Sequence, residues 1–349
     1  MRKTSVLFIV NPISGTHDKR PIIESIPQYL DAKKFVWEVA WTDHRGHAAE
    51  LAQAATADGT DVCVAIGGDG TVNEVARSLR HSLTALAIVP MGSGNGLARH
   101  LGIPMNPEGA LRVLAQCHIE KLDYGLINDI PFFCTCGMGF DAFISERFAT
   151  AGKRGLKTYI ENTLRGGLNY QPETYELEMD GQKEHHKAFL IACGNASQYG
   201  NNFYIAPQAS MSDGLLDVTI MEPFNVLQAP QIVMQMLNKT LDQNPRISTF
   251  QCRELRIHRS QPGVIHYDGD PAEAGTDIEV RLIPHGLRVV VNPDPDRAAA
   301  GPMMHIFQDL YDQITSDIKS QQRKLLAINR NLLDLILQRN STPTDTPQG

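Results

Sequence analysis

The sequence has no apolar run long enough to cross a membrane as a helix, which would take about 20 residues. Its first apolar stretch, Val6–Val10, is also too short for the hydrophobic region of a signal peptide, so we expect a buried strand there. These absences argue against an integral membrane protein and favour a cytoplasmic one.

Cysteines are few, and the six present include no C-x-x-C pair. Cys134 and Cys136 are expected to point the same way on one strand, but two thiols alone make a poor metal site. We therefore expect buried, reduced thiols, which agrees with the reducing environment of the cytosol.

An excess of basic residues is missing as well. The formal net charge is −7, from 32 Lys and Arg against 39 Asp and Glu. Bulk attraction to nucleic acid or to anionic lipid is therefore not expected, and we predict no nucleic-acid partner. The 349 residues are enough for two domains with substantial cores.

What the sequence does contain, in residues 61–100, is two copies of one layout: an apolar run, a glycine-rich turn and a helix. The strand runs are Val62–Ile66 and Leu86–Val89, and the helices are expected over Val72–Leu79 and from Leu97. Short connections imply a right-handed βαβ unit in a parallel sheet. Both turns then lie side by side at the carboxyl ends of neighbouring strands, where open α/β sheets bind ligands.

The two turns read Gly67-Gly68-Asp69-Gly70-Thr71 and Gly92-Ser93-Gly94-Asn95-Gly96. Glycine lets a phosphate come within hydrogen-bond reach of backbone N–H groups. Asp69 would repel bound phosphates unless Mg²⁺ bridges them, or unless it accepts a proton from an attacking hydroxyl. Neither turn fits the dinucleotide fingerprint or the P-loop, so dehydrogenase and P-loop interpretations are disfavoured.

The stretch Gly67–Glu74, GGDGTVNE, resembles the signature of the diacylglycerol kinase catalytic superfamily, which includes soluble bacterial lipid kinases, sphingosine kinases and ceramide kinases. The GGDG core also occurs in NAD kinases and phosphofructokinases. The resemblance spans about residues 5–293 and implies an α/β nucleotide-binding domain, similar to that of NAD kinases, over residues 1–124.

After Lys121–Gly125 the βα rhythm gives way to short alternating runs, separated by Gly, Asn, Asp and Pro. This spacing predicts an antiparallel β-sandwich or barrel-like domain, which we place at residues 125–293 as the lipid-binding domain. Helices are expected after Asp141 and over Val226–Asn238. The expected strands are Phe132–Cys136, Tyr175–Met179, Ala188–Cys193, Leu216–Met221, Glu254–His258, Ile278–Leu282 and Leu287–Val291.

The resemblance also implies which residues bind the nucleotide. They lie in an N-P-x-S-G loop after the first strand, in a threonine-rich turn and in both glycine turns: Asn11, Pro12, Ser14, Gly15, Thr42, Gly67, Gly68, Gly70, Thr71, Glu74, Gly92, Ser93, Gly94 and Asn95. Arg154, in a basic stretch behind Asp141, is the best match by spacing for an arginine that steadies the γ-phosphate.

For the acceptor, Gly139-Phe140-Asp141-Ala142 resembles a G-F-D motif whose aspartate holds the polar head of the lipid, so Asp141 is the substrate-binding candidate. Many bacterial glycerolipid kinases carry an aspartate where this chain has Gly96. The GSGNGLA form is similar to sphingosine kinases, which tilts the expected substrate toward a sphingoid base rather than diacylglycerol.

Two later motifs complete the resemblance. Asp213-Gly214-Leu215-Leu216-Asp217 matches a turn that binds a structural Mg²⁺ in bacterial members, through a side chain and a backbone oxygen, here Asp213 and Leu215. His266–Asp270 matches the D-G-E motif with Asp270 in place of glutamate. Asp69, Asp268 and Asp270 are therefore the candidate catalytic carboxylates.

One segment departs from the family pattern. At Tyr199-Gly200-Asn201-Asn202, two expected glycines are asparagines. Asparagine tolerates left-handed backbone, so the loop is expected to keep its form.

Residues 294–349 lie outside the resemblance and begin with a proline-rich hinge. Apolar spacing over Met303–Asn340 predicts an amphipathic helix, followed by a disordered end. Packing on the first domain is favoured for this helix; a homodimer seam and a membrane surface are the alternatives.

Together these patterns predict an ATP- and Mg²⁺-dependent lipid kinase that transfers the γ-phosphate to a primary hydroxyl of a lipid, by peripheral contact with the inner membrane face. Two alternatives stay open. One is a NAD kinase-like enzyme acting on a soluble acceptor. The other is a non-catalytic lipid- or nucleotide-binding protein of degenerate kinase lineage, suggested by Asp270 and Asn201-Asn202.

Overall fold

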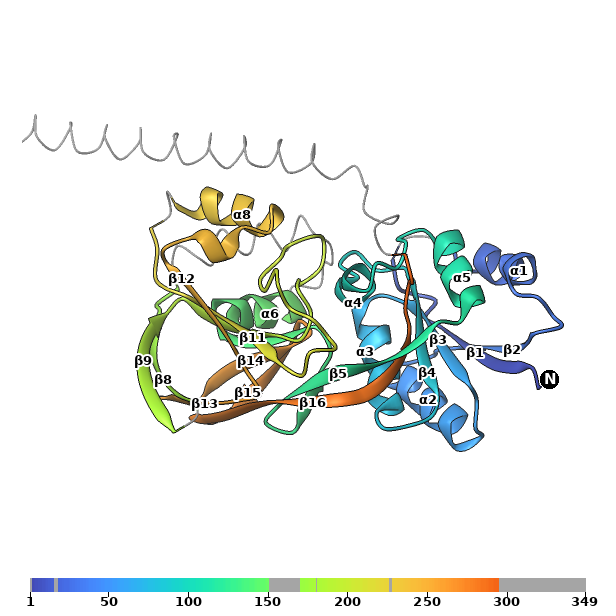
Figure 1. The fold of residues 1–349 in the computed structure, drawn as a ribbon, viewed down its shortest axis with the longest axis horizontal. Helices are drawn as coiled ribbons and strands as arrows, with labels where there is room; N and C mark the ends of the chain where they lie inside the picture. Colours follow the sequence, from blue (N-terminus) through green and yellow to red (C-terminus); the bar gives the residue numbers. More distant parts are fainter. Residues whose placement is uncertain (1, 16–17, 151–169, 180, 226–227, 295–349) are drawn as a thin grey trace, which may run out of the picture. The chain divides into compact units, whose positions relative to one another are not determined.

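The structure, a computed structural model, describes residues 2–15, 18–150, 170–179, 181–225 and 228–294. Strands and helices alternate through the first part of the chain (Figure 1). These elements are β1 Thr4–Val10, α1 Arg20–Tyr29, β2 Phe35–Trp41, α2 His47–Ala57, β3 Val62–Gly67, α3 Asp69–Leu79, β4 Ala85–Pro90, α4 Gly96–His100 and α5 Pro107–Gln116.

The first strands form the predicted parallel sheet, in the order β2-β1-β3-β4. Every residue of β3 and β4 is buried, as expected for strands covered on both faces. In the register between them Gly67 pairs with Pro90, so both strands end at the same edge. The two glycine turns therefore begin side by side, as the sequence predicted.

Helix α3 begins earlier than expected, at Asp69 instead of Val72. Its N-cap is Gly68, which has extended backbone, so Asp69 and Gly70 already belong to the first turn. An acidic residue is favourable there because the N–H groups at a helix N-terminus carry partial positive charge. Half of the first glycine turn is thus the start of a helix.

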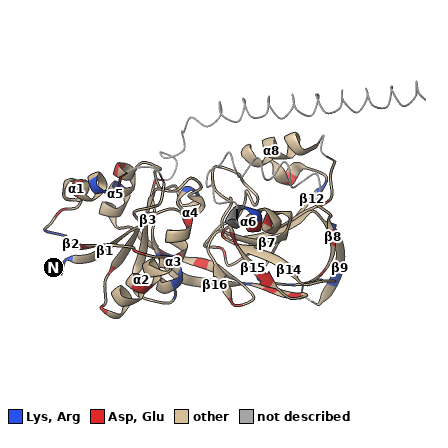
Figure 2. Ribbon diagram, turned by 180° about the vertical axis from the view of Figure 1, so that it is seen from behind, with Lys and Arg blue, Asp and Glu red and all other residues tan. Residues whose placement is uncertain are grey.

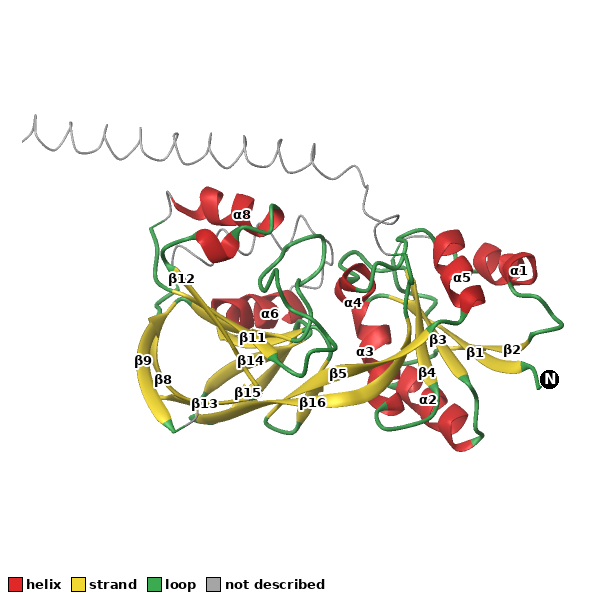
Figure 3. Ribbon diagram, in the orientation of Figure 1, coloured by secondary structure: helices red, strands yellow, loops and turns green. Residues whose placement is uncertain are grey.

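The second part of the chain is mainly antiparallel (Figure 3). Its elements are β5 Ile119–Ile127, β6 Ile130–Phe132, β7 Thr135–Gly139, α6 Phe140–Thr150, β8 Glu173–Met179, β9 Gln182–Ala188, β10 Leu190–Gly194, β11 Leu216–Met221, α8 Ala229–Leu237, the 3₁₀ turn Leu241–Gln243, β12 Ile247–Cys252, β13 Glu254–Arg259, β14 Gly263–Tyr267, β15 Asp270–Ala274 and β16 Asp277–Val290.

Two antiparallel layers enclose a buried core, which confirms the predicted sandwich. One layer is the sheet β12-β11-β10-β7-β14-β15. The other continues the parallel sheet through β16, β13, β8 and β9; β5 pairs with β16, and β6 pairs with β5. Tyr175 and Val280 from this layer share one core cluster with Val218 and Ile265 from the other. The fold class predicted from the sequence is confirmed in the described residues.

Several strand predictions were wrong. The expected strand Ala188–Cys193 includes the last residue of β9 and most of β10. The expected strand Phe132–Cys136 is divided between β6 and β7, because three successive N–H groups at 133–135 donate to a carboxylate instead of a neighbouring strand. The expected pair of strands at the end is one 14-residue strand, β16, with an irregularity between Ile283 and Leu287. The predicted domain boundary at residue 124 falls inside β5 and stays a prediction.

The six cysteines are free, and five of them are buried. Cys134 lies between β6 and β7 and belongs to a different core cluster from Cys136, so the two do not share a strand face as expected. Charged residues of both signs are interspersed along the ribbon (Figure 2). Within the described ranges, no helix is long and apolar enough to span a membrane. The predicted C-terminal helix lies outside those ranges.

Candidate active site

Three loops meet at the carboxyl edge of the parallel sheet, and we call residues 11–15, 67–71 and 92–96 the glycine edge. A Cβ added to Gly92 would lie 2.6 Å from the Cα of Gly68, so the two glycine turns touch backbone to backbone. Gly15 has a φ of +61°, and a Cβ there would collide with the carbonyl of Met91. The close approach of these loops therefore requires glycine at each position.

Asn11 attaches the first loop to the GGDG turn. Its side-chain nitrogen donates to Oγ1 of Thr71 at 2.9 Å, and its backbone N–H donates to the Ile66 carbonyl at 3.0 Å. Oγ of Ser14 donates to the Asn11 carbonyl at 3.1 Å. A Cβ on Gly67 would lie 2.5 Å from the Thr71 oxygen. The structure thus brings the predicted nucleotide residues of the first loop and the GGDG turn together.

Asp69 joins the two glycine turns. Its Oδ1 accepts from the N–H of Gly96 at 2.7 Å, and its Oδ2 accepts from the N–H of Asn95 at 2.8 Å. Burial raises the pKa of Asp69, while these N–H groups and the charge of Arg99 act in the opposite direction. Both oxygens are therefore engaged in holding the second turn. A role of Asp69 in catalysis stays a prediction.

The threonine-rich turn is held against helix α3. The Thr42 side chain is buried, and its backbone N–H donates to the Val10 carbonyl at 2.9 Å. Glu74 accepts from the N–H of Gly46 at 3.0 Å, where Gly46 caps α2 with a φ of 90°. One Glu74 oxygen, assigned to the nucleotide from the sequence, thus contacts this cap. The contact fixes the turn that carries Arg45.

The carboxylates of the HYDGD segment lie in the hairpin between β14 and β15. Asp268 has a φ of 49° and accepts four hydrogen bonds, from Asn73 Nδ2 and from the N–H groups of residues 133, 134 and 135, at 2.6, 2.8, 2.7 and 3.1 Å. Burial raises the pKa of Asp268, and the hydrogen bonds oppose this effect. A carboxylate offers about four acceptor sites. All of them are occupied, which disfavours Asp268 as a base.

Asp270 differs from the other two candidate catalytic carboxylates. Its side chain is 45% exposed and lies 3.7 Å from a guanidinium nitrogen of Arg45. In the part of the chain that the structure describes, its oxygens accept no hydrogen bond. Asp270 is therefore the candidate whose lone pairs remain open to an incoming hydroxyl. Sequence reasoning did not single out Arg45, since its only local signal is a place in the turn after β2.

Asp141 lies in the first turn of α6 and is buried. Its Oδ1 accepts from the N–H of Ala142 at 2.8 Å, and its Oδ2 is contacted by Tyr199 and His266, at 3.0 and 2.9 Å. Neither of these two partners was predicted. His266 had one signal, its place in the HYDGD motif. We call Asp141, Tyr199 and residues 266–270 the hairpin side of the site.

The segment that departs from the family pattern packs on the second glycine turn. Asn201 and Asn202 have φ angles of 52° and 62°, which confirms that asparagine keeps the left-handed backbone. The N–H of Asn201 donates to the Gly94 carbonyl at 3.2 Å. A Cβ on Gly96 would lie 3.2 Å from the Tyr199 carbonyl oxygen. Little room is left for a side chain at position 96.

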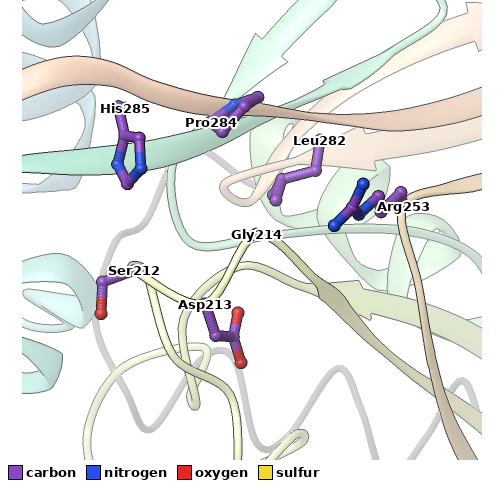
Figure 4. Close-up of a pocket in the computed structure, with 7 residues that line it drawn as sticks. All are labelled: Ser212, Asp213, Gly214, Arg253, Leu282, Pro284 and His285. Carbon is purple, nitrogen blue, oxygen red and sulfur yellow. The ribbon is translucent and has the colours of Figure 1, made fainter.

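The predicted metal turn borders a cavity of about 420 Å³ (Figure 4). Asp213 Oδ1 accepts from the N–H of Leu215 at 3.0 Å. Among the described residues, no three His, Cys, Asp or Glu side chains cluster as metal ligands. Arg253 and His285 line the same cavity. The assignment of Asp213 and Leu215 to a magnesium site stays a prediction. Arg154 lies outside the described residues.

Comparison with known families agrees with this geometry. The family described as "Diacylglycerol kinase catalytic domain" matches residues 5–127, and "YegS C-terminal NAD kinase beta sandwich-like domain" matches residues 134–291. A Chromohalobacter salexigens protein named "Probable lipid kinase YegS-like" is 30% identical over 232 residues, covering 65% of this chain and 75% of that protein. This chain belongs to the diacylglycerol kinase family.

Other members of the family share most of the chain. A Mycobacterium tuberculosis protein named "Diacylglycerol kinase" is 29% identical over 252 residues, which are 70% of this chain and 81% of that protein. A diacylglycerol kinase structure from Bacillus anthracis has a TM-score of 0.65 at 20% identity, covering 84% and 98% of the two chains. An Archaeoglobus fulgidus NAD kinase structure has a TM-score of 0.50 at 12% identity, covering 84% and 96%. The last two likenesses concern the fold alone.

Proposed function

We propose that this member of the diacylglycerol kinase family is an ATP-dependent lipid kinase, which transfers the γ-phosphate to a primary hydroxyl of a membrane lipid. One observation carries the proposal. The hydrogen bond of 2.6 Å between Asn73 and Asp268 ties the hairpin of the open carboxylate Asp270 to the helix that starts in the GGDG turn. This hydrogen bond therefore connects the glycine edge, where the phosphates would bind, to the hairpin that carries the proposed proton acceptor Asp270.

In the proposed reaction, the backbone N–H groups of the glycine edge hold the triphosphate. Asp270 accepts the proton of the lipid hydroxyl, whose oxygen attacks the γ-phosphorus. The bond from the γ-phosphorus to the bridging oxygen breaks, and ADP leaves with that electron pair. A magnesium ion arriving with the nucleotide would neutralise phosphate charge. Positioning and charge stabilisation supply most of the acceleration in such transfers.

Two acceptor classes compete within this proposal. The names of the relatives favour diacylglycerol, and the absence of a side chain at Gly96 favours a sphingoid base. Either acceptor lies in a membrane, so the proposal includes peripheral contact with a lipid surface.

The test is a radiolabelled γ-phosphate transfer assay with diacylglycerol, sphinganine and ceramide in mixed micelles, with NAD as a soluble acceptor. Lipid-dependent labelling supports the proposal, and the ratio of kcat/KM values ranks the acceptors. Labelling of NAD instead of lipid would replace it with the NAD kinase-like alternative. Binding of ATP and lipid without turnover would identify a non-catalytic binding protein.

A further inference from the structure

A buried polar cluster joins three elements on the hairpin side: Asp141 at the start of α6, Tyr199 in the loop after β10, and His266 on β14. The side chains of His266 and Asp141 are only 2% and 6% exposed. Polar groups are rarely buried to this extent without a partner that accounts for them. The burial of these two side chains is therefore explained by the hydrogen bonds between them and their neighbours.

The hydrogen bonds around Asp141 fix its carboxylate from three directions. His266 Nε2 lies 2.9 Å from Oδ2, and the Tyr199 hydroxyl donates to the same oxygen at 3.0 Å. An ionised carboxylate can only accept, so Nε2 carries the proton in this pair. The N–H of Ala142 holds the second oxygen at 2.8 Å. The carboxylate therefore has one orientation, which His266 helps to set.

The strand pairing makes room for this pair. His266 lies opposite Gly137 in the register between β14 and β7. A Cβ at position 137 would lie 2.7 Å from Asp141 Oδ2, 3.1 Å from His266 Nε2 and 2.5 Å from the Ile191 carbonyl oxygen. Any side chain there would displace the carboxylate or the imidazole. The absence of a side chain at Gly137 is thus part of the contact.

The second ring nitrogen of His266 makes the imidazole energetically unfavourable at this position. Nδ1 of His266 is buried and has no hydrogen-bond partner within the described residues. An apolar side chain would fill this place without leaving a buried polar atom unsatisfied. The contact of Nε2 with Asp141 is therefore the feature that accounts for histidine at this position.

His266 also links Asp141 to the open carboxylate. Across the hairpin His266 pairs with Pro271, and Tyr267 pairs with Asp270. The backbone that carries His266 is therefore the backbone that places Asp270. A shift of the hairpin would move both the donor to Asp141 and the proposed base.

We infer that His266 is a positioning residue for the lipid acceptor. Through Nε2 it holds Asp141, the candidate for the lipid head, in fixed geometry relative to Asp270. This inference rests on the proposed lipid kinase function. Because the hydroxyl must lie between the head-binding carboxylate and the base, loosening Asp141 lowers the use of lipid and leaves nucleotide binding intact.

The test compares two amides that differ in reach. In His266→Gln the side-chain N–H can extend as far as Nε2 does, whereas in His266→Asn it is one methylene shorter. We expect kcat/KM for the lipid to fall about 30- to 100-fold in His266→Asn and to stay within about 5-fold of wild type in His266→Gln. KM for ATP should be unchanged in both. Equal kinetics in the two variants, whether impaired or normal, would overturn the inference.

A matched control lies elsewhere in the chain. His81 Nε2 makes a comparable contact of 2.9 Å with the hydroxyl of Tyr124. His81 lies in the turn between α3 and β4, and Tyr124 lies on β5, so neither belongs to the hairpin side. His81→Asn should leave lipid kinetics as they are. A loss in this control equal to that of His266→Asn would indicate a general effect of removing a histidine contact and would overturn the assignment.

Nitrogen NMR gives a readout that does not depend on activity. We expect Nε2 of His266 to be protonated in the wild-type protein and its resonance to move in Asp141→Ala. An unprotonated Nε2, or no change in Asp141→Ala, would contradict the inference, even if His266→Asn does not fold. Failure of the proposed function looks different: wild type would then show no lipid-dependent turnover while the NMR coupling remains.

Discussion

The glycine edge and the hairpin side are built in different ways. At the glycine edge backbone meets backbone, and a single Cβ on Gly92 would come within 2.6 Å of the Cα of Gly68. On the hairpin side the contacts are made by side chains, such as Asp141 with His266 and Asp268 with Asn73. A contact between two backbones leaves no room for a side chain at the glycine. A contact between two side chains can be kept when one of them is replaced by a residue of similar reach and hydrogen-bonding capacity.

The positions at which the sequence differs from the motifs it resembles can be placed in these two regions. Asp270, where the resemblance leads one to expect glutamate, lies on the hairpin side and is 45% exposed. Asn201 and Asn202 replace glycines in a segment that contacts the glycine edge, but they supply left-handed backbone themselves.

The largest expected effect concerns the open carboxylate. Asp270→Ala removes the proposed proton acceptor, so kcat should fall by about 10² to 10⁴, while the exposed position should keep stability within about 0.5 kcal/mol. Asp270→Glu should retain measurable turnover, since the charge is kept. The measurement is lipid-dependent kcat together with urea unfolding.

A matched control is Asp129→Ala, which removes a comparable exposed ion pair, 3.6 Å from Arg281. This variant should turn over normally. Normal turnover of Asp270→Ala as well would show that Asp270 does not accept the proton, and the proposed chemical role of the hairpin side would be wrong.

The second prediction concerns Asp69, whose side chain accepts hydrogen bonds from backbone N–H groups of the glycine edge. In Asp69→Asn, an amide NH₂ replaces one acceptor and faces the N–H of Asn95 or Gly96. We expect a loss of about 1–3 kcal/mol in the free energy of unfolding, and kcat lower by about 100-fold or more. Calorimetry and turnover assays check this. Unaltered stability would show that the two turns do not depend on Asp69.

The third prediction uses two glycines of the same edge. Gly92→Ala should destabilise the fold by about 1–3 kcal/mol, because its Cβ has no room. Gly70→Ala meets nothing within 4 Å and lies in α3, so it should stabilise the fold by about 0.5–1 kcal/mol. Chemical unfolding of both variants measures the difference. Equal effects would contradict the requirement for glycine at the point of contact.

The fourth prediction is a pH dependence at His100. His100 follows the second glycine turn and accepts at Nδ1 from the N–H of Ser197 at 3.1 Å. Burial, with a contribution from Lys239, lowers the pKa of His100 from 6.5 to about 4. The unfolded chain binds the proton more readily, so this stability is complete above about pH 6.5 and is lost as pH falls toward about 4.

Urea unfolding near pH 8 and near pH 5 measures this effect. Between these values His100 should account for a loss of about 2 kcal/mol in wild type, which His100→Gln should remove. The same pH dependence in both proteins would mean that the imidazole is not held in its neutral form.

The local features of the fold were predictable from the sequence. Strand β11 matches the expected Leu216–Met221. Strand β3 is one residue longer than expected at its end, and β4 is one residue longer at each end. In these strands, continuous apolar runs and flanking glycines determine the structure over a few neighbouring residues. The edge strand β9, QKEHHKA, was missed because it is largely exposed and has no apolar pattern.

The contacts that assemble the site could not be predicted in the same way. Asp268 is bound by groups from α3 and from residues 133–135, which are 195 and 133 to 135 positions away in the sequence. The periodicity of apolar residues along a sequence does not predict contacts between residues so far apart. Sequence patterns therefore singled out these carboxylates as candidates, but they could not tell that Asp268 accepts four hydrogen bonds while Asp270 accepts none within the described residues.

The pairing of strand β16 determines which fragments of this chain can fold. It pairs with β4 near its end and with β5 along most of its length, so the last described strand completes the sheet that the first strands begin. A gene truncated after residue 124 would lack this partner and would end in the middle of β5. The unpaired strand edges left behind are templates for aggregation. Fragments of this protein should therefore be recovered as soluble material only when both pieces are expressed together.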